Sequence, residues 1–311
     1  MIQLYKERKM PDIIGDIHGA FDALEMLFRR LGYVKRNGIY RHPERYPVFV
    51  GDYIDRGDKV LETLQLIRSM QESDNAITLM GNHEYNYLCL QTESYSGKML
   101  RENSENNLKQ VAKTNSALFK PQERKSYLKW MSELPLIAES AAFRVVHAQW
   151  NDKDVSMLRL SGIKKLNREN LNKIHNDNAL KSSVEIILKG KEVELPRLLH
   201  YQDYEGHARD NARISWWKKK NGDKLGDIFA SLPQQVAEKK VGRFKHDFNE
   251  YYPKNERPVF FGHYWLPPSD FGLTADNACC VDFSIAKYGL LAAYRFNGEK
   301  KLSPKNLIKH Y

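Results

Sequence analysis

The chain has 311 residues, of which 41% are hydrophobic and 28% are charged, and its formal net charge is +10. This composition is ordinary for a soluble globular protein, and the length is enough for one large core or two smaller ones. The sequence contains no run of about 18 apolar residues, so we expect no membrane span and no membrane partner.

Only three cysteines are present, and none belongs to a Cys-x-x-Cys pair. The first eight residues lack the apolar middle of a secretion signal, so we expect a reduced, cytoplasmic setting. The positive charge has two interpretations: it belongs to a solvated surface, or it attracts phosphorylated substrates. Nucleic acid stays open as a partner, but no zinc-finger or RNA-binding motif supports it.

The first 90 residues alternate between short apolar runs and helical patterns. The runs at 13–14, 48–50 and 77–80 are typical of buried strands, and apolar residues recur with helical spacing over 21–31 and 60–70. Strand–loop–helix units of this kind predict an α/β fold, in which ligands gather beyond the carboxyl ends of the strands.

The later part of the core has a different order of elements. The polar stretch at 91–130 predicts helices packed over the core, and 145–146 predicts another short strand. The core pattern returns at 258–261, and two further strands are expected near 279–283 and 288–296.

Residues 151–254 differ in character from the sequence on either side. They are basic, carry tyrosines and tryptophans, and have one clear strand signal, at 184–188. We interpret them as an inserted cap, called the insert below, which interrupts a core formed by residues 10–150 and 255–300.

Three glycine-bounded strings follow the first three strands: GDIHG at 15–19, GDYIDRG at 51–57 and GNHE at 81–84. Similar Gly-Asp and Gly-Asn pairs occur in ordinary turns. Turns alone do not explain why these histidines, and later His147 and His263, all come just after apolar strands. Carboxylate, imidazole and amide oxygen together can hold two divalent transition-metal ions, a standard device for in-line displacement at phosphorus.

The three strings and the two later histidines, taken in this order, resemble the calcineurin-like metallophosphoesterase superfamily. The similarity is to its branch of phosphoprotein phosphatases and bacterial diadenosine tetraphosphatase-like enzymes, and it runs from Asp16 to His263 without covering the insert. The resemblance implies an α/β/β/α sandwich of two mixed sheets, to which we add a largely helical inserted cap. Five blocks in order are a far more specific signal than any one of them.

The resemblance also implies a set of metal ligands. Asp52 corresponds to the carboxylate that bridges both metals, where it would partly neutralise two neighbouring cations. Imidazole ligands favour Mn, Fe, Ni, Co or Zn over Mg or Ca, and we expect two divalent ions, with manganese as the first choice. The implied ligands are Asp16 and His18 for the first metal, Asn82 and His147 for the second, the shared Asp52, and His263.

Three further residues correspond to catalytic groups of the family. His83 resembles the acid that protonates the leaving oxygen, and Asp55 would orient this imidazole and favour its charged form. Arg56 resembles the guanidinium that grips two phosphate oxygens. The implied reaction is in-line attack by a metal-bridging hydroxide, without a covalent phospho-enzyme.

The chain departs from the family pattern around these blocks. Met80 stands where protein phosphatases carry an arginine before Gly-Asn-His, so one phosphate-binding charge is missing from its usual place. Aromatic residues follow the two late histidines. Trp150, Tyr264 and Trp265 either stack on a nucleobase or phenyl ring, or pack in the core.

The insert offers two arginines that could replace the missing charge. If their segment is helical, Arg209 and Arg213 share one face, and we hypothesise that one of them reaches the substrate phosphate. The alternative is that these arginines pair with nearby acids while Trp216 and Trp217 pack on the core.

The preferred function is hydrolysis of phosphate monoesters or nucleoside polyphosphates by a phosphoesterase with two metal ions. Its partner would be a phosphorylated small molecule, a nucleotide or a phosphoprotein. Alternatives are a serine/threonine phosphoprotein phosphatase or a phosphatase that acts on polynucleotide ends. A non-catalytic scaffold on the same fold is an alternative of a different class. Such a scaffold would be expected to have lost one or more ligands, whereas every ligand position of the family is filled in this sequence.

Overall fold

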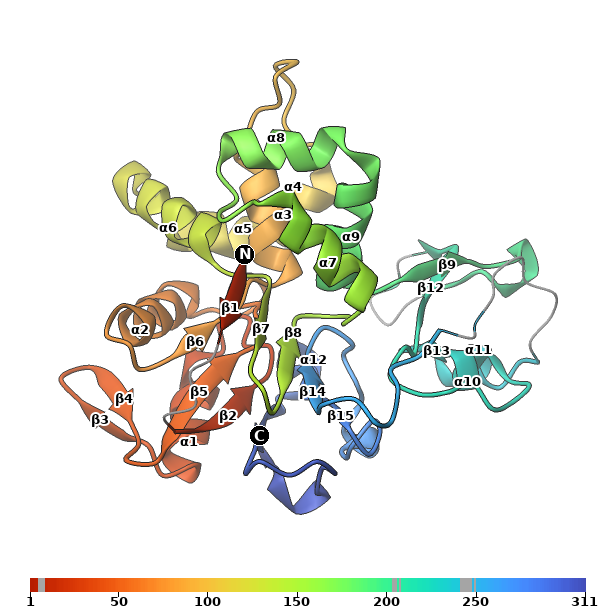
Figure 1. The fold of residues 1–311 in the computed structure, drawn as a ribbon. Helices are drawn as coiled ribbons and strands as arrows, with labels where there is room; N and C mark the ends of the chain where they lie inside the picture. Colours follow the sequence, from red (N-terminus) through yellow and green to blue (C-terminus); the bar gives the residue numbers. More distant parts are fainter. Residues whose placement is uncertain (5–8, 203–205, 207, 241–247, 249) are drawn as a thin grey trace.

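The computed structural model describes residues 1–4, 9–202, 206, 208–240, 248 and 250–311. Two five-stranded mixed sheets form its centre (Figure 1). In the first sheet the strand order is β17 (Leu307–His310), β16 (Leu291–Arg295), β2 (Met10–Ile14), β5 (Arg45–Phe49) and β6 (Ile77–Thr78). In the second it is β1 (Ile2–Leu4), β7 (Ile137–Glu139), β8 (Arg144–Val146), β14 (Val259–Phe261) and β15 (Ala278–Cys280).

The two sheets share one hydrophobic core. The rings of Phe260 in β14 and Tyr294 in β16 have centroids 5.0 Å apart, and both side chains are fully buried. Strands β2, β5 and β6 run parallel to one another, as do β8, β14 and β15. The predicted sandwich of two mixed sheets is confirmed, and the carboxyl ends of these parallel strands are where its ligands are expected.

Helices after β2, β5 and β6 complete the strand–helix units that the sequence predicts. In α1 (Phe21–Arg30), Leu24, Leu27 and Phe28 have the spacing of one helix face and are buried against the core. The corresponding residues of α2 (Val60–Glu72) are buried in the same way. All nine residues of α3 (Asn82–Leu90) are buried, so this helix is enclosed on every side.

Short elements complete the chain around the two sheets. Within the described residues, every helix is too short or too polar to cross a membrane. The elements are β3 (Val34–Arg36), β4 (Ile39–Arg41), α4 (Glu105–Gln110), α5 (Ala112–Ala117), α6 (Pro121–Glu133), η2 (Pro268–Asp270), α12 (Ile285–Tyr288) and η3 (Pro304–Asn306).

The first part of the insert is helical and joins the main core. It forms α7 (Asp152–Ser161), α8 (Arg168–Asn176) and α9 (Asn178–Lys189). Helix α8 contacts α3, since Nε2 of His175 is 3.3 Å from the hydroxyl oxygen of Tyr85. The strand expected at 184–188 is wrong, because this run belongs to α9. Its buried residues Leu180, Val184 and Ile187 follow helical spacing, and Asp177 caps the helix through its side chain.

The second part of the insert forms a small sheet, called the cap sheet below. Its order is β13 (Phe229–Ala230), β12 (Asn211–Ile214) and β9 (Glu192–Glu194). A separate apolar cluster supports it, made of Leu195, Ala212, Ile214, Leu225, Ile228, Phe229, Leu232 and Val236. Its other elements are η1 (Arg197–Leu199), β10 (Tyr201–Gln202), β11 (Ala208–Arg209), α10 (Leu225–Ile228) and α11 (Gln234–Ala237). The boundary expected between core and insert stays a prediction.

The segment of Arg209 and Arg213 is not helical, so the condition under which the two arginines would share a helix face is not met. Arg209 lies in β11 and Arg213 in β12. The alternation Asn211–Ile214, with Ala212 and Ile214 buried and their neighbours half-buried, is the pattern of a strand with one covered face. Trp216 and Trp217 follow β12 and pack on Phe261 of β14, which attaches the cap sheet to the core.

Candidate metal centre and its pocket

The six predicted ligands lie together at one edge of the sandwich. Each of them follows the carboxyl end of a strand, and all are buried. Asp16 and His18 follow β2, Asp52 follows β5, Asn82 follows β6, His147 follows β8 and His263 follows β14. The two sheets thus contribute residues to one site. The roles of these six residues as metal ligands stay predictions.

Asp52 lies at the middle of this group. Its Oδ2 atom is 3.7 Å from Nε2 of His18 and 3.4 Å from Nε2 of His147. Oδ1 of Asn82 is 3.0 Å from Nε2 of His147 and 2.7 Å from Nδ1 of His263. Asp16 joins the group because its Oδ2 accepts a hydrogen bond of 3.0 Å from the backbone N–H of His263.

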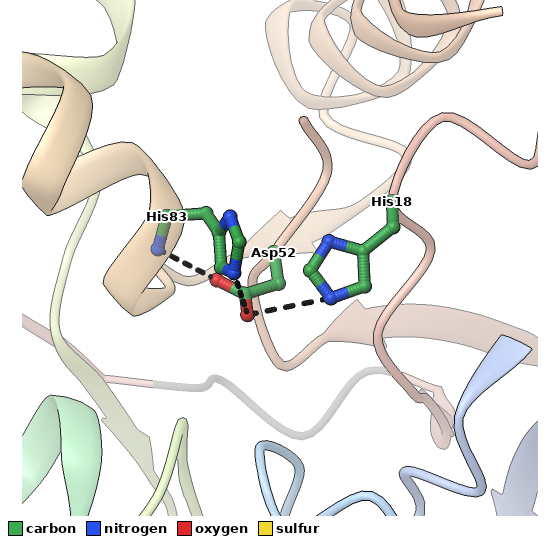
Figure 2. A group of neighbouring side chains, drawn as sticks. All are labelled: His18, Asp52 and His83. Atoms are coloured by element: carbon green, nitrogen blue, oxygen red, sulfur yellow. Dashed lines mark hydrogen bonds and ion pairs between the residues drawn. The ribbon is translucent and has the colours of Figure 1, made fainter. Parts of the chain in front are cut away.

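Two sets of three side chains have ligand atoms within 4.8 Å of one another, and they share Asp52. One set is Asp52, His147 and His263. The other is His18, Asp52 and His83, which Figure 2 shows with both imidazoles turned toward the carboxylate. His83, predicted as an acid, therefore lies as close to the centre as the predicted ligands.

The inner atoms of this group fit metal ions. Oδ1 of Asp16, Nε2 of His18 and Nε2 of His263 are buried and have no hydrogen-bond partner among the described residues. A buried polar atom without a partner is costly, and a coordinated cation would remove that cost. Backbone carbonyls hold the outer ring nitrogens: Nδ1 of His18 is 2.9 Å from the oxygen of Ile54, and Nδ1 of His147 is 2.9 Å from that of Val50.

Two glycines allow the backbone to approach the carboxylates. A Cβ atom on Gly81 would lie 2.1 Å from Oδ1 of Asp52, and one on Gly262 would lie 2.0 Å from Oδ1 of Asp16. Any larger residue would displace these oxygens. The glycines before Asn82 and His263 are thus required by the close packing of the ligands.

The loops around the centre hold side chains in strained backbone conformations. Residues other than glycine with positive φ, between 46° and 72°, gather there. Such conformations persist only where the surrounding structure fixes them, and they are typical of functional sites. They are His18, Asp52, Asp55, Arg56, His263, Trp265 and Ser284.

Electrostatics separates the two aspartates. Burial raises the pKa of Asp16 well above its usual value, and the charges of Asp282 and Asp52 add to this effect. Burial also raises the pKa of Asp52, but His147 and His83 outweigh it, so this pKa is well below its usual value. Burial, with the charge of His83, lowers the pKa of His18 to about 3. His18 is thus neutral, the form that binds metals.

His83 and Asp55 form a close pair. Nδ1 of His83 is 2.5 Å from Oδ2 of Asp55, and Oδ1 of Asp55 accepts a 2.5 Å hydrogen bond from the hydroxyl of Thr114 in α5. Burial lowers the pKa of His83, but the negative charges of Asp52 and Asp55 outweigh it and raise this pKa above the usual value. No sequence motif indicates Thr114, which lies 59 residues from Asp55 in a polar helix.

Glu84 connects the second and third strings. Its carboxylate accepts hydrogen bonds from the backbone N–H groups of Gly81 at 3.0 Å, Asp52 at 2.9 Å and Tyr53 at 2.8 Å. Burial raises the pKa of Glu84 to about 7, and the charge of Asp52 contributes. Glu84 thus fixes the loop of Asp52 against α3 from behind the centre.

A pocket of about 350 Å³ opens beside the centre, between the core and the cap sheet. Nε of Arg213 in its wall is 3.2 Å from Oε1 of Glu192, so this arginine pairs with an acid of the neighbouring strand. Arg101, in the loop before α4, was not predicted, because no motif surrounds it. The cationic residues that line the pocket are Arg56, Arg101, Lys189, Arg209 and Arg213.

The aromatic residues after the late histidines differ in their surroundings. Trp265 lines the pocket and stacks on Arg56, with 3.8 Å between the guanidinium carbon and the ring centroid. Its backbone N–H donates to Oδ2 of Asp282 at 2.7 Å. Tyr264 also lines the pocket but is fully buried against Trp217. Trp150 is buried beneath the guanidinium of Arg144.

The model of the family described as calcineurin-like phosphoesterase matches residues 12–263. The chain belongs to this family. The predicted resemblance is confirmed, and the two clusters that share Asp52 agree with the pair of metal ions that calcineurin-like phosphoesterases use.

Curated relatives match parts of the chain. An asymmetrical bis(5'-nucleosyl)-tetraphosphatase of Halalkalibacterium halodurans is 45% identical over 73 residues, which are 23% of this chain and 30% of that protein. A symmetrical bis(5'-nucleosyl)-tetraphosphatase of Vibrio parahaemolyticus is 30% identical over 143 residues, 45% of this chain and 46% of that one. The chain thus spans less than half the length of these relatives.

Solved structures share the fold of this calcineurin-like phosphoesterase. A serine/threonine phosphatase from Saccharomyces cerevisiae aligns with a TM-score of 0.53 and 16% identity, over 100% of this chain and 82% of that one. A cold-active protein tyrosine phosphatase aligns with a TM-score of 0.52 and 18% identity, over 94% and 75%.

Replacing Asp52 should disrupt both metal positions at once. We expect the unchanged protein to bind about two equivalents of manganese and the Asp52→Asn variant to bind fewer than one, because the amide lacks the charge that two cations would share. Metal analysis after gel filtration measures this. Asp58→Asn, an exposed change in the same loop, should keep two equivalents. Two equivalents in Asp52→Asn would contradict the bridging assignment.

Trp265 should hold Arg56 in a position to bind phosphate. Because a cation–π contact contributes about 0.5–2 kcal/mol, Trp265→Ala should weaken binding of inorganic phosphate roughly 3- to 30-fold. Titration calorimetry on the manganese-loaded protein measures the affinity. Trp265→Phe, which keeps an aromatic face, should lose much less. Equal affinities for all three proteins would show that the stacking does not position Arg56.

Proposed function

We propose that this chain is a metal-dependent phosphoesterase that hydrolyses phosphate monoesters or nucleoside polyphosphates. The observation that carries the proposal is a single arrangement: two ligand clusters share Asp52, and a pocket lined by arginines opens beside them. Membership of the calcineurin-like phosphoesterases supports the same reaction class.

The proposed ligands divide into two groups around Asp52. Asp16 and His18 would hold one ion with Asp52, and Asn82, His147 and His263 would hold the other. When bound, two such ions neutralise charge on the phosphoryl group and lower the pKa of the attacking water. Three imidazoles with carboxylate and amide oxygens favour manganese or another late divalent metal over magnesium.

His83 would act as the general acid. In this role Asp55 would accept a hydrogen bond from Nδ1–H of His83, 2.5 Å away, and Nε2 lies 3.9 Å from Oδ2 of Asp52. A proton on Nε2 would then be available to a leaving oxygen that develops negative charge. Thr114 fixes Asp55 from the opposite side, so the imidazole has one orientation.

Arg56 is the proposed phosphate-binding residue nearest the centre. Its guanidinium carbon lies 3.8 Å from the ring centroid of Trp265, and a planar guanidinium can donate two parallel hydrogen bonds to a phosphate. Arg209 and Arg213 are proposed to approach the substrate from the cap side of the pocket. Arg213 also pairs with Glu192 of the neighbouring strand β9.

A substrate of nucleotide size suits the pocket better than a folded protein surface. The pocket is bounded by the core on one side and by strands of the cap sheet on the other. The tetraphosphatase names of the partial relatives agree with this choice. We also propose a reducing, cytoplasmic setting, which the three free, buried cysteines support.

A substrate panel tests the proposal. With manganese we expect turnover of p-nitrophenyl phosphate and of diadenosine tetraphosphate, and weaker turnover of a phosphopeptide. EDTA should lower each rate by at least about 100-fold, because the attacking water is no longer activated. Phosphate release measures each rate. Turnover of none of them with Mn, Fe, Ni, Co or Zn would sink the proposal and favour a scaffold. A preference for a phosphorylated oligonucleotide that falls steeply with salt would favour polynucleotide ends.

The leaving group should reveal the role of His83. His83→Ala should slow the hydrolysis of phenyl phosphate by about 100-fold or more. The hydrolysis of p-nitrophenyl phosphate should slow far less, because only the poorer leaving group needs a proton. Steady-state kinetics and metal analysis together measure this. Asp55→Asn should act in the same direction, and the double variant should lose little more than His83→Ala. Equal slowing of both esters at full metal content would speak against His83 as the acid.

A further inference from the structure

Arg101 reaches the pocket from a segment that none of the family's five blocks includes. It lies in the loop between α3 and α4, where its backbone N–H donates to the carbonyl of Cys89 near the end of α3. Its Nη2 donates to Oδ1 of Asn107 at 2.7 Å and to Oε1 of Gln110 at 3.3 Å. Two neutral side chains of α4 thus hold the guanidinium at the pocket wall.

Arg101 forms no ion pair within the part of the chain that the structure describes. Among the described residues no carboxylate lies within ion-pair distance of it, whereas Arg213 pairs with Glu192 and Lys189 pairs with Glu185. Arg101 is half-buried, its Nε is buried without a hydrogen-bond partner, and burial lowers the pKa of Arg101. A partly desolvated cation with neutral partners favours the binding of an anion beside it.

Arg101 lies close to the reacting centre but is not part of it. Nε2 of Gln110 is 3.3 Å from Nδ1 of His83, so one amide group separates the guanidinium from the acid pair. Asn86, one turn beyond Asn82 on the same face of α3, lines the pocket as well. An anion at Arg101 would therefore be a neighbour of the phosphate at the metal centre.

We propose that Arg101 binds a second phosphate of the substrate, next to the one that is attacked, and so selects phosphoanhydride chains over simple monoesters. This inference rests on the proposed function and narrows its substrate class to polyphosphates. Met80 leaves the pocket without an arginine before Gly-Asn-His, and Arg101 supplies a cation from a different loop.

The test compares one-phosphate and multi-phosphate substrates. We expect Arg101→Ala to lower kcat/KM for diadenosine tetraphosphate about 10- to 100-fold, as loss of a charged hydrogen bond does, and to change that for p-nitrophenyl phosphate less than about 3-fold. Arg101→Gln, which can still bond to Asn107 or Gln110, should behave like Arg101→Ala. Lys109→Ala removes an equal charge from an exposed position on α4 and should leave kcat/KM unchanged for both substrates.

A binding measurement keeps the test independent of turnover. With saturating manganese, Arg101→Gln should weaken the binding of methylenediphosphonate, a diphosphate analogue. The loss of affinity should be about 10-fold larger than the loss for inorganic phosphate. Equal losses for both ligands, or for both substrates, would overturn the proposal and leave Arg101 as a residue that positions Gln110 and His83. Unchanged values would overturn it too. An unmodified protein that turns over nothing would instead refute the proposed function, while the two affinities would still judge Arg101.

Discussion

The buried carboxylate of Asp52 faces imidazoles that come from both sheets of the sandwich. His18 follows β2 in the first sheet and His147 follows β8 in the second, and both turn Nε2 toward Oδ2 of Asp52. Burying this carboxylate is costly, and the surrounding imidazoles together with the N–H of His83 stabilise its charged form. The closeness of these groups requires the two sheets to keep one relative position, so the packing of the core and the assembly of the centre depend on each other.

Strain around the centre is balanced by hydrogen bonds behind it. Asp52 and Asp55 both have positive φ, which is unfavourable for residues with a side chain. Glu84 accepts hydrogen bonds from four backbone N–H groups around Asp52. Thr114 accepts a hydrogen bond from the backbone N–H of Asp55 and donates one to its carboxylate. The rigid part of the site therefore includes residues that never face the pocket. Changes in Glu84 or Thr114 would alter the site by loosening its loops.

The gathering of the candidate ligands at one edge of the sheets could be predicted because each part of the pattern is local. A strand, a glycine and a ligand occur within a few residues, and parallel strands bring such endings to one edge. The elements of the insert were harder to predict. The apolar run in α9 suits a strand as well as a helix, and no turn or cap signal before Arg213 indicates that it lies in a strand. Arg101 and Thr114 could not be predicted at all, because their roles arise from contacts with residues far along the chain.

The two ends of the pocket are built from different parts of the chain, and this separates chemistry from selectivity. The end beside the candidate metal centre is formed by residues of the glycine-bounded motifs and by His263. The outer wall is formed by the loop of Arg101, the end of α9 and the cap sheet. The cap sheet is nevertheless fixed to the centre, since Nε1 of Trp216 donates to the carbonyl of Ala148, the residue after His147. Its strands can therefore vary in the side chains they present to a substrate without moving His147. Under the proposed function, selectivity for the groups beyond the reacting phosphorus would depend on the outer wall, while the proposed ligands around Asp52 stay unchanged.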